Sequence, residues 1–324
     1  MKPLISISTI LFLSTFNSQS ADLHCDQQNI DFAQLKEQLS VIFINDTKVA
    51  DNGKIKQQLF STDTQQYLKL YNHCLKPVIK KHGINKYDKA QLHALYKALY
   101  AITLFSSDLS ATTDFAKIIY RKVELKENPA VYIEKLYQAY IQTRQFTKAQ
   151  ELVNDYPQLN LSERVTVIDA TGKGSKPYRT NQDGVRSLFT LNQQGNQITR
   201  HKFEFPQGVH IVVVSSSICN PCKRLFTWLK SEPQLMKVME EHTTWLVPPE
   251  GRLFVNEMLE TQKTFAPIKL FYAHKQQEWP EISYWATPTF YFYQNGELIG
   301  QLVGWPQEGQ KEKLVAILKA LSLV

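Results

Sequence analysis

Apolar residues recur every three or four positions over much of the first half of the chain. A repeat of about 3.6 residues is typical of helices that bury one face. We therefore expect residues 22–160 to form an all-helical domain. The segments with this spacing are Phe32–Leu39, Tyr67–Leu75, Leu92–Leu99, Phe115–Val123 and Tyr132–Tyr140.

The end of this helical region has a more specific pattern. Asn128 is suited to cap a helix, and Pro129 then falls at the first helical position, where its missing N–H costs little. Residues 136–157 look like a tetratricopeptide-type helix pair, and Ala116 lies 33 residues before Ala149, which is consistent with one earlier repeat. The domain is expected to be tetratricopeptide-like at its end.

The pattern changes to short β-rich runs after about residue 185. Two strands are predicted at Arg186–Leu191 and Gln197–Phe205. A continuous apolar run at Val209–Val214 then predicts a strand buried on both faces. The preceding residues 161–184 contain Gly172 and Gly174 and lack the full pattern of a phosphate loop, so we expect a linker.

A hairpin and a helix are predicted near the end of the chain. Asn295-Gly296 separates two β-rich runs, which is the strongest short signal for a type I′ turn. Apolar residues at helical spacing follow, including Leu314 and Leu318, and predict a closing amphipathic helix.

The candidate chemistry lies between these elements, in Cys219-Asn220-Pro221-Cys222, shortly after the buried strand. Two thiols at this spacing, where a strand gives way to a helix, are suited to thiol–disulfide exchange. The helix N-terminus stabilises a thiolate on Cys219, and Cys222 can close a disulfide with it.

Zinc sites use the same CxxC spacing but need two more ligands nearby, usually as a second close pair. Cys25 and Cys74 lie far upstream and far apart, and His201 and His210 fall on separate predicted strands. The redox interpretation is therefore favoured, and no metal is expected.

Taken together, these features resemble the thioredoxin superfamily over roughly residues 185–324. The shared features are a strand, a CxPC at a helix start, Thr287-Pro288 before a hairpin, a glycine after its second strand and a closing helix. The resemblance implies a thioredoxin-fold domain with a mixed central sheet. It also implies that Cys219 attacks substrate disulfides and Cys222 resolves the mixed disulfide. Pro288 would be a cis-proline that leaves the backbone of Thr287 free to pair with an extended substrate.

The chain departs from thioredoxin at several positions. Ile218 stands where thioredoxin has a tryptophan, and Val213 stands where it has a buried acid that helps to deprotonate the resolving thiol. Glu204 or Asp183 are the candidates to supply that acid from elsewhere. Lys223 and Arg224 either lower the pKa of the first cysteine or are simply solvated residues of the helix.

The 69 residues from Cys219 to Pro288 exceed the interval in a minimal thioredoxin. An insertion is therefore expected within residues 243–285. Its many aromatic residues either shape a substrate surface or, as is more common for aromatics, belong to the core.

The beginning of the chain predicts export. Lys2 and the apolar stretch from Leu4 to Phe16 are typical of a signal peptide spanning residues 1–21, with cleavage near Ser20 or Ala21. We expect the mature protein in a periplasm. In an oxidising compartment the remaining pair, Cys25 and Cys74, is expected to form a structural disulfide, contributing about 4 kcal/mol.

The chain is therefore expected to be a periplasmic thiol–disulfide oxidoreductase that acts on client proteins with disulfides, as a reductase. No nicotinamide or flavin motif is visible, so no cofactor is expected, and electrons would come from a membrane donor. A formal charge of +7 without a basic stripe argues against nucleic-acid binding. The alternatives are a disulfide isomerase or oxidase, or a non-enzymatic adaptor whose helical domain binds a partner. Oligomeric state is not predicted.

Overall fold

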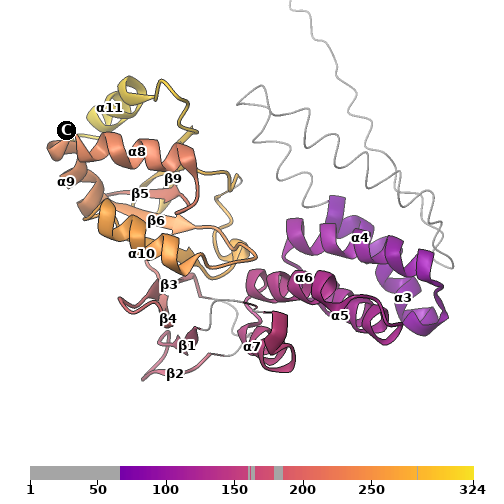
Figure 1. The fold of residues 1–324 in the computed structure, drawn as a ribbon. Coiled ribbons are helices and arrows are strands. Elements are labelled where there is room, and N and C mark those ends of the chain that lie inside the picture. The colour runs from indigo at the N-terminus through magenta and orange to yellow at the C-terminus, as the bar shows by residue number, and fades with distance from the viewer. Residues whose placement is uncertain (1–65, 160, 162–164, 179–184, 283) are drawn as a thin grey trace, which may run out of the picture.

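The computed structural model describes residues 66–159, 161, 165–178, 185–282 and 284–324. Among these residues, the N-terminal part is helical, and the C-terminal part combines a mixed sheet with helices (Figure 1). This confirms the predicted succession of a helical region and a mixed sheet. The signal peptide and the helix expected at Phe32–Leu39 lie outside the described residues.

The helices of the N-terminal part begin where the sequence supplies capping side chains. The Asp88 carboxylate accepts a hydrogen bond from the Gln91 N–H at 2.9 Å, and the Gln91 side chain accepts one from the Asp88 N–H at 3.0 Å. Asp108 and Asn128 cap the next two long helices, and Pro129 follows Asn128 as predicted. The helices of this part are η2 (Leu70–Leu75, a π-helical turn), α3 (Lys76–His82), η3 (Ile84–Lys86), α4 (Lys89–Ser106), α5 (Leu109–Glu124), α6 (Pro129–Gln142), α7 (Phe146–Asp155) and η4 (Pro157–Leu159).

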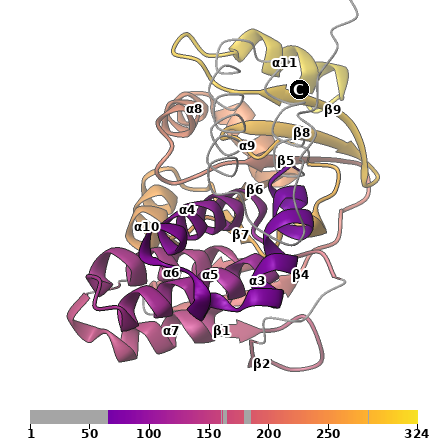
Figure 2. The same cartoon turned by 90° about the vertical axis from the view of Figure 1, so that its right-hand side faces the viewer.

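These helices pack in sequence, α4 against α5, α5 against α6 and α6 against α7. Figure 1 shows these helices beside the C-terminal part, and in Figure 2 they lie in front of part of the sheet. The tetratricopeptide-like character of their last pair stays a prediction. No helix within the described residues has the length and hydropathy needed to cross a bilayer.

The described residues of the C-terminal part form a nine-stranded sheet in the order β2-β1-β4-β3-β7-β6-β5-β8-β9. The central strand β5 runs parallel to β6 and antiparallel to β8, and β6 runs parallel to β7. This arrangement is compatible with a thioredoxin-like fold. The strands are β1 (Thr166–Asp169), β2 (Lys176–Pro177), β3 (Ser187–Leu191), β4 (Gln197–Lys202), β5 (Val209–Val214), β6 (Thr243–Val247), β7 (Leu270–Ala273), β8 (Thr289–Gln294) and β9 (Glu297–Val303).

The predicted type I′ turn joins β8 and β9. Asn295 has a φ of 52° and Gly296 a φ of 84°, so both central residues lie in the left-handed region that this turn requires. The closing helix α11 follows at Lys311–Ala320, and it buries Leu314 and Leu318.

The two faces of β5 are covered by different kinds of structure. Ile211 and Val213 belong to the main core with residues of α8 (Asn220–Lys230), α10 (Val255–Thr264) and α11. Val212 and Val214 pack in a second cluster with Trp279, which follows the short η5 (Gln276–Glu278). A largely non-helical connection between β7 and β8 therefore covers the second face.

Part of the predicted linker belongs to the sheet. β1 pairs in parallel with β4, and β2 pairs antiparallel with β1. Asp169 of β1 forms an ion pair with Arg200 of β4 at 3.2 Å, and Arg200 also contacts Glu278 at 3.3 Å. Strand hydrogen bonds and this buried ion-pair network fix β1 and β2 at the edge of the sheet. The loop-like composition of the segment did not indicate these strands.

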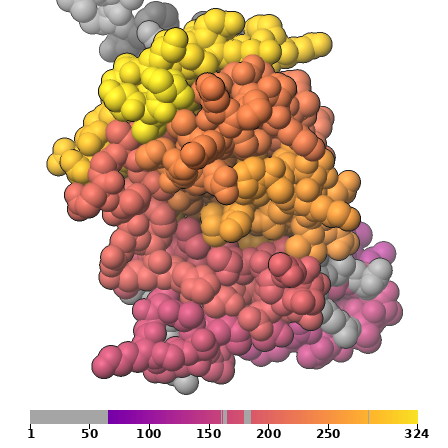
Figure 3. Space-filling view, turned by 90° about the vertical axis from the view of Figure 1, so that its left-hand side faces the viewer, coloured from indigo at the N-terminus to yellow at the C-terminus, as the bar shows by residue number. Residues whose placement is uncertain are grey.

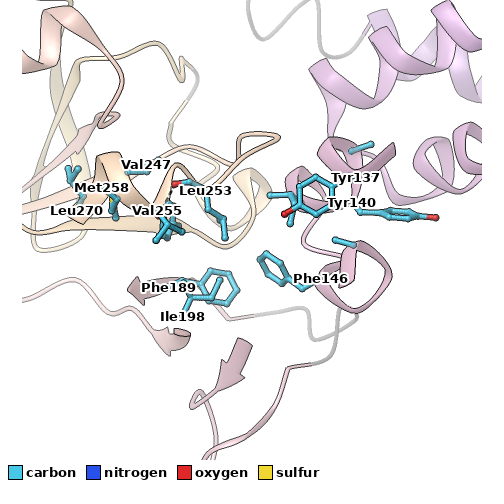
Figure 4. Packing of buried hydrophobic residues seen from close by; sticks show 14 of the residues in the cluster. Tyr137, Tyr140, Phe146, Phe189, Ile198, Val247, Leu253, Val255, Met258 and Leu270 are labelled. Atoms are coloured by element: carbon cyan, nitrogen blue, oxygen red, sulfur yellow. Dashed lines mark hydrogen bonds between the residues drawn. The ribbon is translucent and has the colours of Figure 1, made fainter. Parts of the chain in front are cut away.

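The helical part and the sheet share one continuous hydrophobic core. Tyr137 and Tyr140 of α6 and Phe146 of α7 are buried in the same cluster as Phe189 of β3 and Leu253 (Figure 4). The rings of Phe146 and Phe189 meet nearly at right angles, with centroids 5.7 Å apart. The two parts are therefore packed together and not joined by a free tether.

A buried arginine adds polar contacts to this interface. Arg144, which is 1% exposed, lies between α6 and α7. Its guanidinium donates hydrogen bonds to the carbonyl oxygens of Ala273 at 2.7 Å and His274 at 3.2 Å, at the end of β7. Figure 3 views the molecule from the side opposite to Figure 2, where salmon, orange and yellow residues of the C-terminal part form most of the face and magenta residues form its lower edge.

Candidate active site

Cys219 and Cys222 lie at the start of α8, after the loop that leaves β5. Cys219 is the N-cap of this helix, and its Sγ accepts a hydrogen bond from the Cys222 N–H at 3.3 Å. Both cysteines are free thiols, Cys219 partly exposed and Cys222 fully buried. An accessible thiol backed by a buried one suits attack on a partner disulfide followed by internal resolution.

The environment moves the pKa values of the two thiols in opposite directions. A hydrogen bond from the Cys222 thiol lowers the pKa of Cys219 to about 6, with help from the Cys222 N–H and the charge of Arg224, against the cost of partial burial. Burial raises the pKa of Cys222, and its contact with Cys219 raises it further. Cys219 is therefore the thiolate of the pair at neutral pH.

The peptide bond between Thr287 and Pro288 is cis, as the resemblance implied. Because Val214 at the end of β5 pairs with Thr289 at the start of β8, this bond lies beside the cysteine pair. The Cys219 Sγ is 3.4 Å from the carbonyl oxygen of Thr287. The sheet thus brings together two residues that are distant in the sequence.

A buried carboxyl group also lies at the site, and the sequence analysis missed it. Burial raises the pKa of Glu250 to about 7, against the opposing effects of Arg144 and Ser216, and the negative charge of Cys219 adds to the rise. The Glu250 Oε2 is buried without a hydrogen-bond partner. Ser216 contacts Glu250 through its side chain and Cys222 through its backbone, which places the carboxyl close to both thiols.

Sheet topology explains the position of Glu250. β5 and β6 are parallel neighbours, with Val214 paired to Leu246, so the segments that follow them emerge at the same edge. Cys219 follows β5 and Glu250 follows β6. The acid that β5 lacks therefore comes from the segment after the neighbouring strand β6, which the sequence analysis did not predict, and only the pairing of β5 with β6 reveals it.

The acids proposed from the sequence do not supply this carboxyl group. Glu204 is exposed and pairs with Lys202, so that prediction is wrong, and Asp183 lies outside the described residues. Arg224 lowers the pKa of Cys219 and donates a hydrogen bond to the Trp305 carbonyl at 3.0 Å.

Most aromatic residues named here from the expected insertion belong to the core, and one lies nearer the surface. Trp245, Tyr272, Trp279 and Tyr284 are buried and belong to the core. Phe254 lies nearer the surface, at the loop after Glu250, and adopts a left-handed conformation with φ 52°.

The remaining predicted residues lie away from the cysteine pair. Cys74 is disulfide-bonded and buried in η2, but its predicted partner Cys25 lies outside the described residues, so that pairing stays a prediction. His201 contacts Thr190, and His210 contacts Thr244, within the sheet. No cluster of three or more His, Cys, Asp or Glu side chains suited to a metal occurs in the described part of the chain.

Comparison with solved structures shows a weak structural likeness. No family model matches the chain, and no curated protein matches it. A thioredoxin-like protein from Bacteroides caccae, solved by crystallography, is 13% identical with a TM-score of 0.29, over 91% of this chain and 88% of that chain. A likeness at that level carries no argument about the site.

Proposed function

We propose that this protein is an exported, periplasmic thiol–disulfide oxidoreductase that reduces disulfides in client proteins through Cys219 and Cys222. The observation that carries the proposal is the arrangement around Cys219. Its sulfur is a helix N-cap with a lowered pKa, backed by a buried thiol and 3.4 Å from the carbonyl beside a cis-proline.

The first step is attack by the Cys219 thiolate on a client disulfide. A bond forms between the Cys219 sulfur and one client sulfur, the client S–S bond breaks, and the other client sulfur leaves as a thiolate that takes a proton. The Thr287 carbonyl beside Pro288 accepts a backbone N–H of the client and holds the reacting sulfurs in line.

The second step releases the reduced client. Cys222 loses its proton and attacks the Cys219 sulfur, which closes the Cys219–Cys222 disulfide and expels the client sulfur as a thiolate. The client gains two electrons and the cysteine pair loses two. An external dithiol, here proposed to be a membrane-linked donor, then reduces the pair.

Glu250 is the proton acceptor for the second step in this mechanism. Cys222 is buried and has a raised pKa, so it needs a base to become a nucleophile. A carboxyl with a pKa of about 7, which has the neighbour Ser216 in common with Cys222, can take that proton near neutral pH and return it in the next cycle.

A disulfide isomerase or oxidase is the second candidate. The lowered pKa of Cys219 favours it, because stabilising the thiolate stabilises the reduced form and makes the disulfide a stronger oxidant. The proline before Cys222 resembles reductive members of the superfamily and is the reason that we place the reductase first.

The proposal is tested by turnover of a disulfide-bonded peptide with dithiothreitol as the electron donor. Wild type is expected to accelerate reduction, and Cys219→Ser to abolish the acceleration. Reduced Cys222→Ser, mixed with the peptide after dithiothreitol has been removed, is expected to accumulate a mixed disulfide with it. Absence of acceleration by folded wild type would instead favour the adaptor.

Cys74→Ser serves as the control. It is expected to lower the melting temperature while keeping turnover. Loss of turnover in a folded Cys74→Ser protein would refute the structural role of that disulfide.

A further inference from the structure

A pocket opens beside the cysteine pair, where the helical part meets the sheet. It has a volume of about 330 Å³ and is lined from both parts of the chain. α4 and α6 form one wall, and the loop before α10 forms the other; Figure 1 shows this loop directed toward α6. Its lining includes Tyr100, Leu104, Gln138, Ile218, Glu250 and Phe254.

The pocket is next to the reactive sulfur. Ile218 precedes Cys219 directly, and Glu250 interacts electrostatically with the Cys219 thiolate. A polypeptide bound through a disulfide to Cys219 must therefore extend past the mouth of this pocket. Its residues next to the attacked cysteine are within reach of the lining side chains.

The lining offers exposed apolar surface from both parts of the chain. Leu104 of α4 is 41% exposed and Ile218 is 43% exposed, although both are large hydrophobic residues. Single exposed hydrophobics are ordinary, but these two line one pocket, together with the rings of Tyr100 and Phe254. Phe254 also has a left-handed backbone, a conformation that concentrates at ligand-binding sites.

We infer that this pocket receives an apolar side chain of the client polypeptide, adjacent to the cysteine that Cys219 attacks. The occupant is an extended segment with a residue such as leucine beside its disulfide. Polar groups also line the pocket, namely the Glu250 carboxyl and the Gln138 amide, whose oxygen and nitrogen contact Lys135 and Glu134. This inference rests on the proposed reductase function and gives the helical part a role in selecting clients.

The test compares two disulfide-bonded peptides that differ only in leucine or glycine beside one cysteine. The readout is the ratio of their kcat/KM values. Wild type is expected to prefer the leucine peptide about tenfold, the scale of discrimination that an apolar pocket provides. Leu104→Gln is expected to reduce the ratio to about threefold or less. Val131→Gln changes an exposed apolar residue of α6 (55% exposed, against 41% for Leu104) that does not line the pocket, and it is expected to keep the wild-type ratio.

A second measurement avoids any change in the pocket. The leucine is replaced by a photo-crosslinking residue, and the peptide is trapped as a mixed disulfide on Cys222→Ser. Crosslinks are expected to α4 near Leu104 or to α6 near Gln138. Crosslinks confined to other elements would overturn the inference.

The outcomes separate this inference from the proposed function. The pocket assignment would be overturned if wild type reduced the leucine and glycine peptides at equal rates, or if its preference for leucine survived Leu104→Gln. In either case, reduction of oxidised glutathione by wild type would still support the reductase. If wild type reduced neither peptide nor oxidised glutathione, the proposed function would fail, and the inference would fail with it.

Discussion

At the scale of single residues, the reactivity of the pair depends on side chains that three separate segments bring together. Cys219 and Cys222 come from the start of α8, Thr287 and Pro288 precede β8, and Glu250 follows β6. The cysteines could be predicted from their local motif, whereas the cis bond before Pro288 was implied by the resemblance to the thioredoxin superfamily. Glu250 could not be predicted by counting along one strand, since only the parallel pairing of β5 and β6 places it beside Cys219.

Glu250→Gln tests the proton acceptor. At about pH 8 the wild-type carboxyl is ionised and can accept the Cys222 proton, whereas glutamine cannot. We expect resolution of a preformed mixed disulfide to slow by on the order of 10-fold to 100-fold at this pH. At about pH 5.5 wild-type Glu250 is protonated, so the two proteins should differ little. Stopped-flow rates across this range give the profile, and an equal slowing at every pH would argue against a titrating acceptor.

The same substitution has a consequence for stability. Because folding raises the pKa of Glu250 from 4.5 to about 7, its protonated form is favoured in the folded state. The stabilisation that the protonated Glu250 carboxyl gives the folded state is fully present below about pH 4.5 and is lost as the pH rises through 7. Glutamine has no such pH-dependent loss. The unfolding free energy of Glu250→Gln minus that of wild type should therefore increase by up to about 3 kcal/mol between about pH 4 and about pH 8. Urea denaturation at both pH values measures it, and a difference independent of pH would contradict the raised pKa.

At the scale of elements, local signals predicted some of the strands and helices around the site but not β6, which positions Glu250. β5 follows from its apolar run, α6 from Asn128-Pro129, and the β8–β9 hairpin from Asn295-Gly296. β1 and β2 were missed because their residues have a loop-like composition. Their positions depend on pairing with β4 and on the contact between Asp169 and Arg200, which are not local properties.

The hairpin turn provides an element-scale prediction. Gly296 has a φ of 84°, a region that an L-residue enters at a cost, so Gly296→Ala should lower the free energy of unfolding by about 1–2 kcal/mol. Gly300→Ala is the matched control on β9, with φ outside that region and nothing within 4 Å of an added Cβ. It should change stability by less than about 0.5 kcal/mol. Chemical denaturation decides, and equal effects of the two substitutions would refute the assigned turn.

At the scale of the whole molecule, the two parts act as one unit because they share a core and because Arg144 connects them. The sequence predicted two domains and a linker. Hydrophobic periodicity shows which face of each segment is apolar, but it does not show which other segment that face packs against. Arg144 has no motif that would reveal it. Only the fold shows that its guanidinium reaches the carbonyls at the end of β7 and lowers the pKa of Glu250.

Arg144→Met therefore tests whether the interface affects the site. The change leaves two buried carbonyl groups without their donor and should cost about 2–4 kcal/mol of unfolding free energy. It also removes a positive charge that lowers the pKa of Glu250, so the pH profile of resolution should move to higher pH. Arg121→Met removes only an exposed ion pair with Glu124 and should leave the profile unchanged. A profile unaffected by Arg144→Met would show that Arg144 is purely structural.

The reduction potential of the Cys219–Cys222 pair is the most direct test of the central claim. The protein is equilibrated with mixtures of reduced and oxidised dithiothreitol or glutathione, and the fraction with both thiols free is measured by alkylation. A reductase is predicted to show a reversible two-electron transition near or below about −250 mV. A potential of about −120 to −180 mV would place the pair with oxidases and isomerases, and no reversible disulfide would contradict the account as a whole.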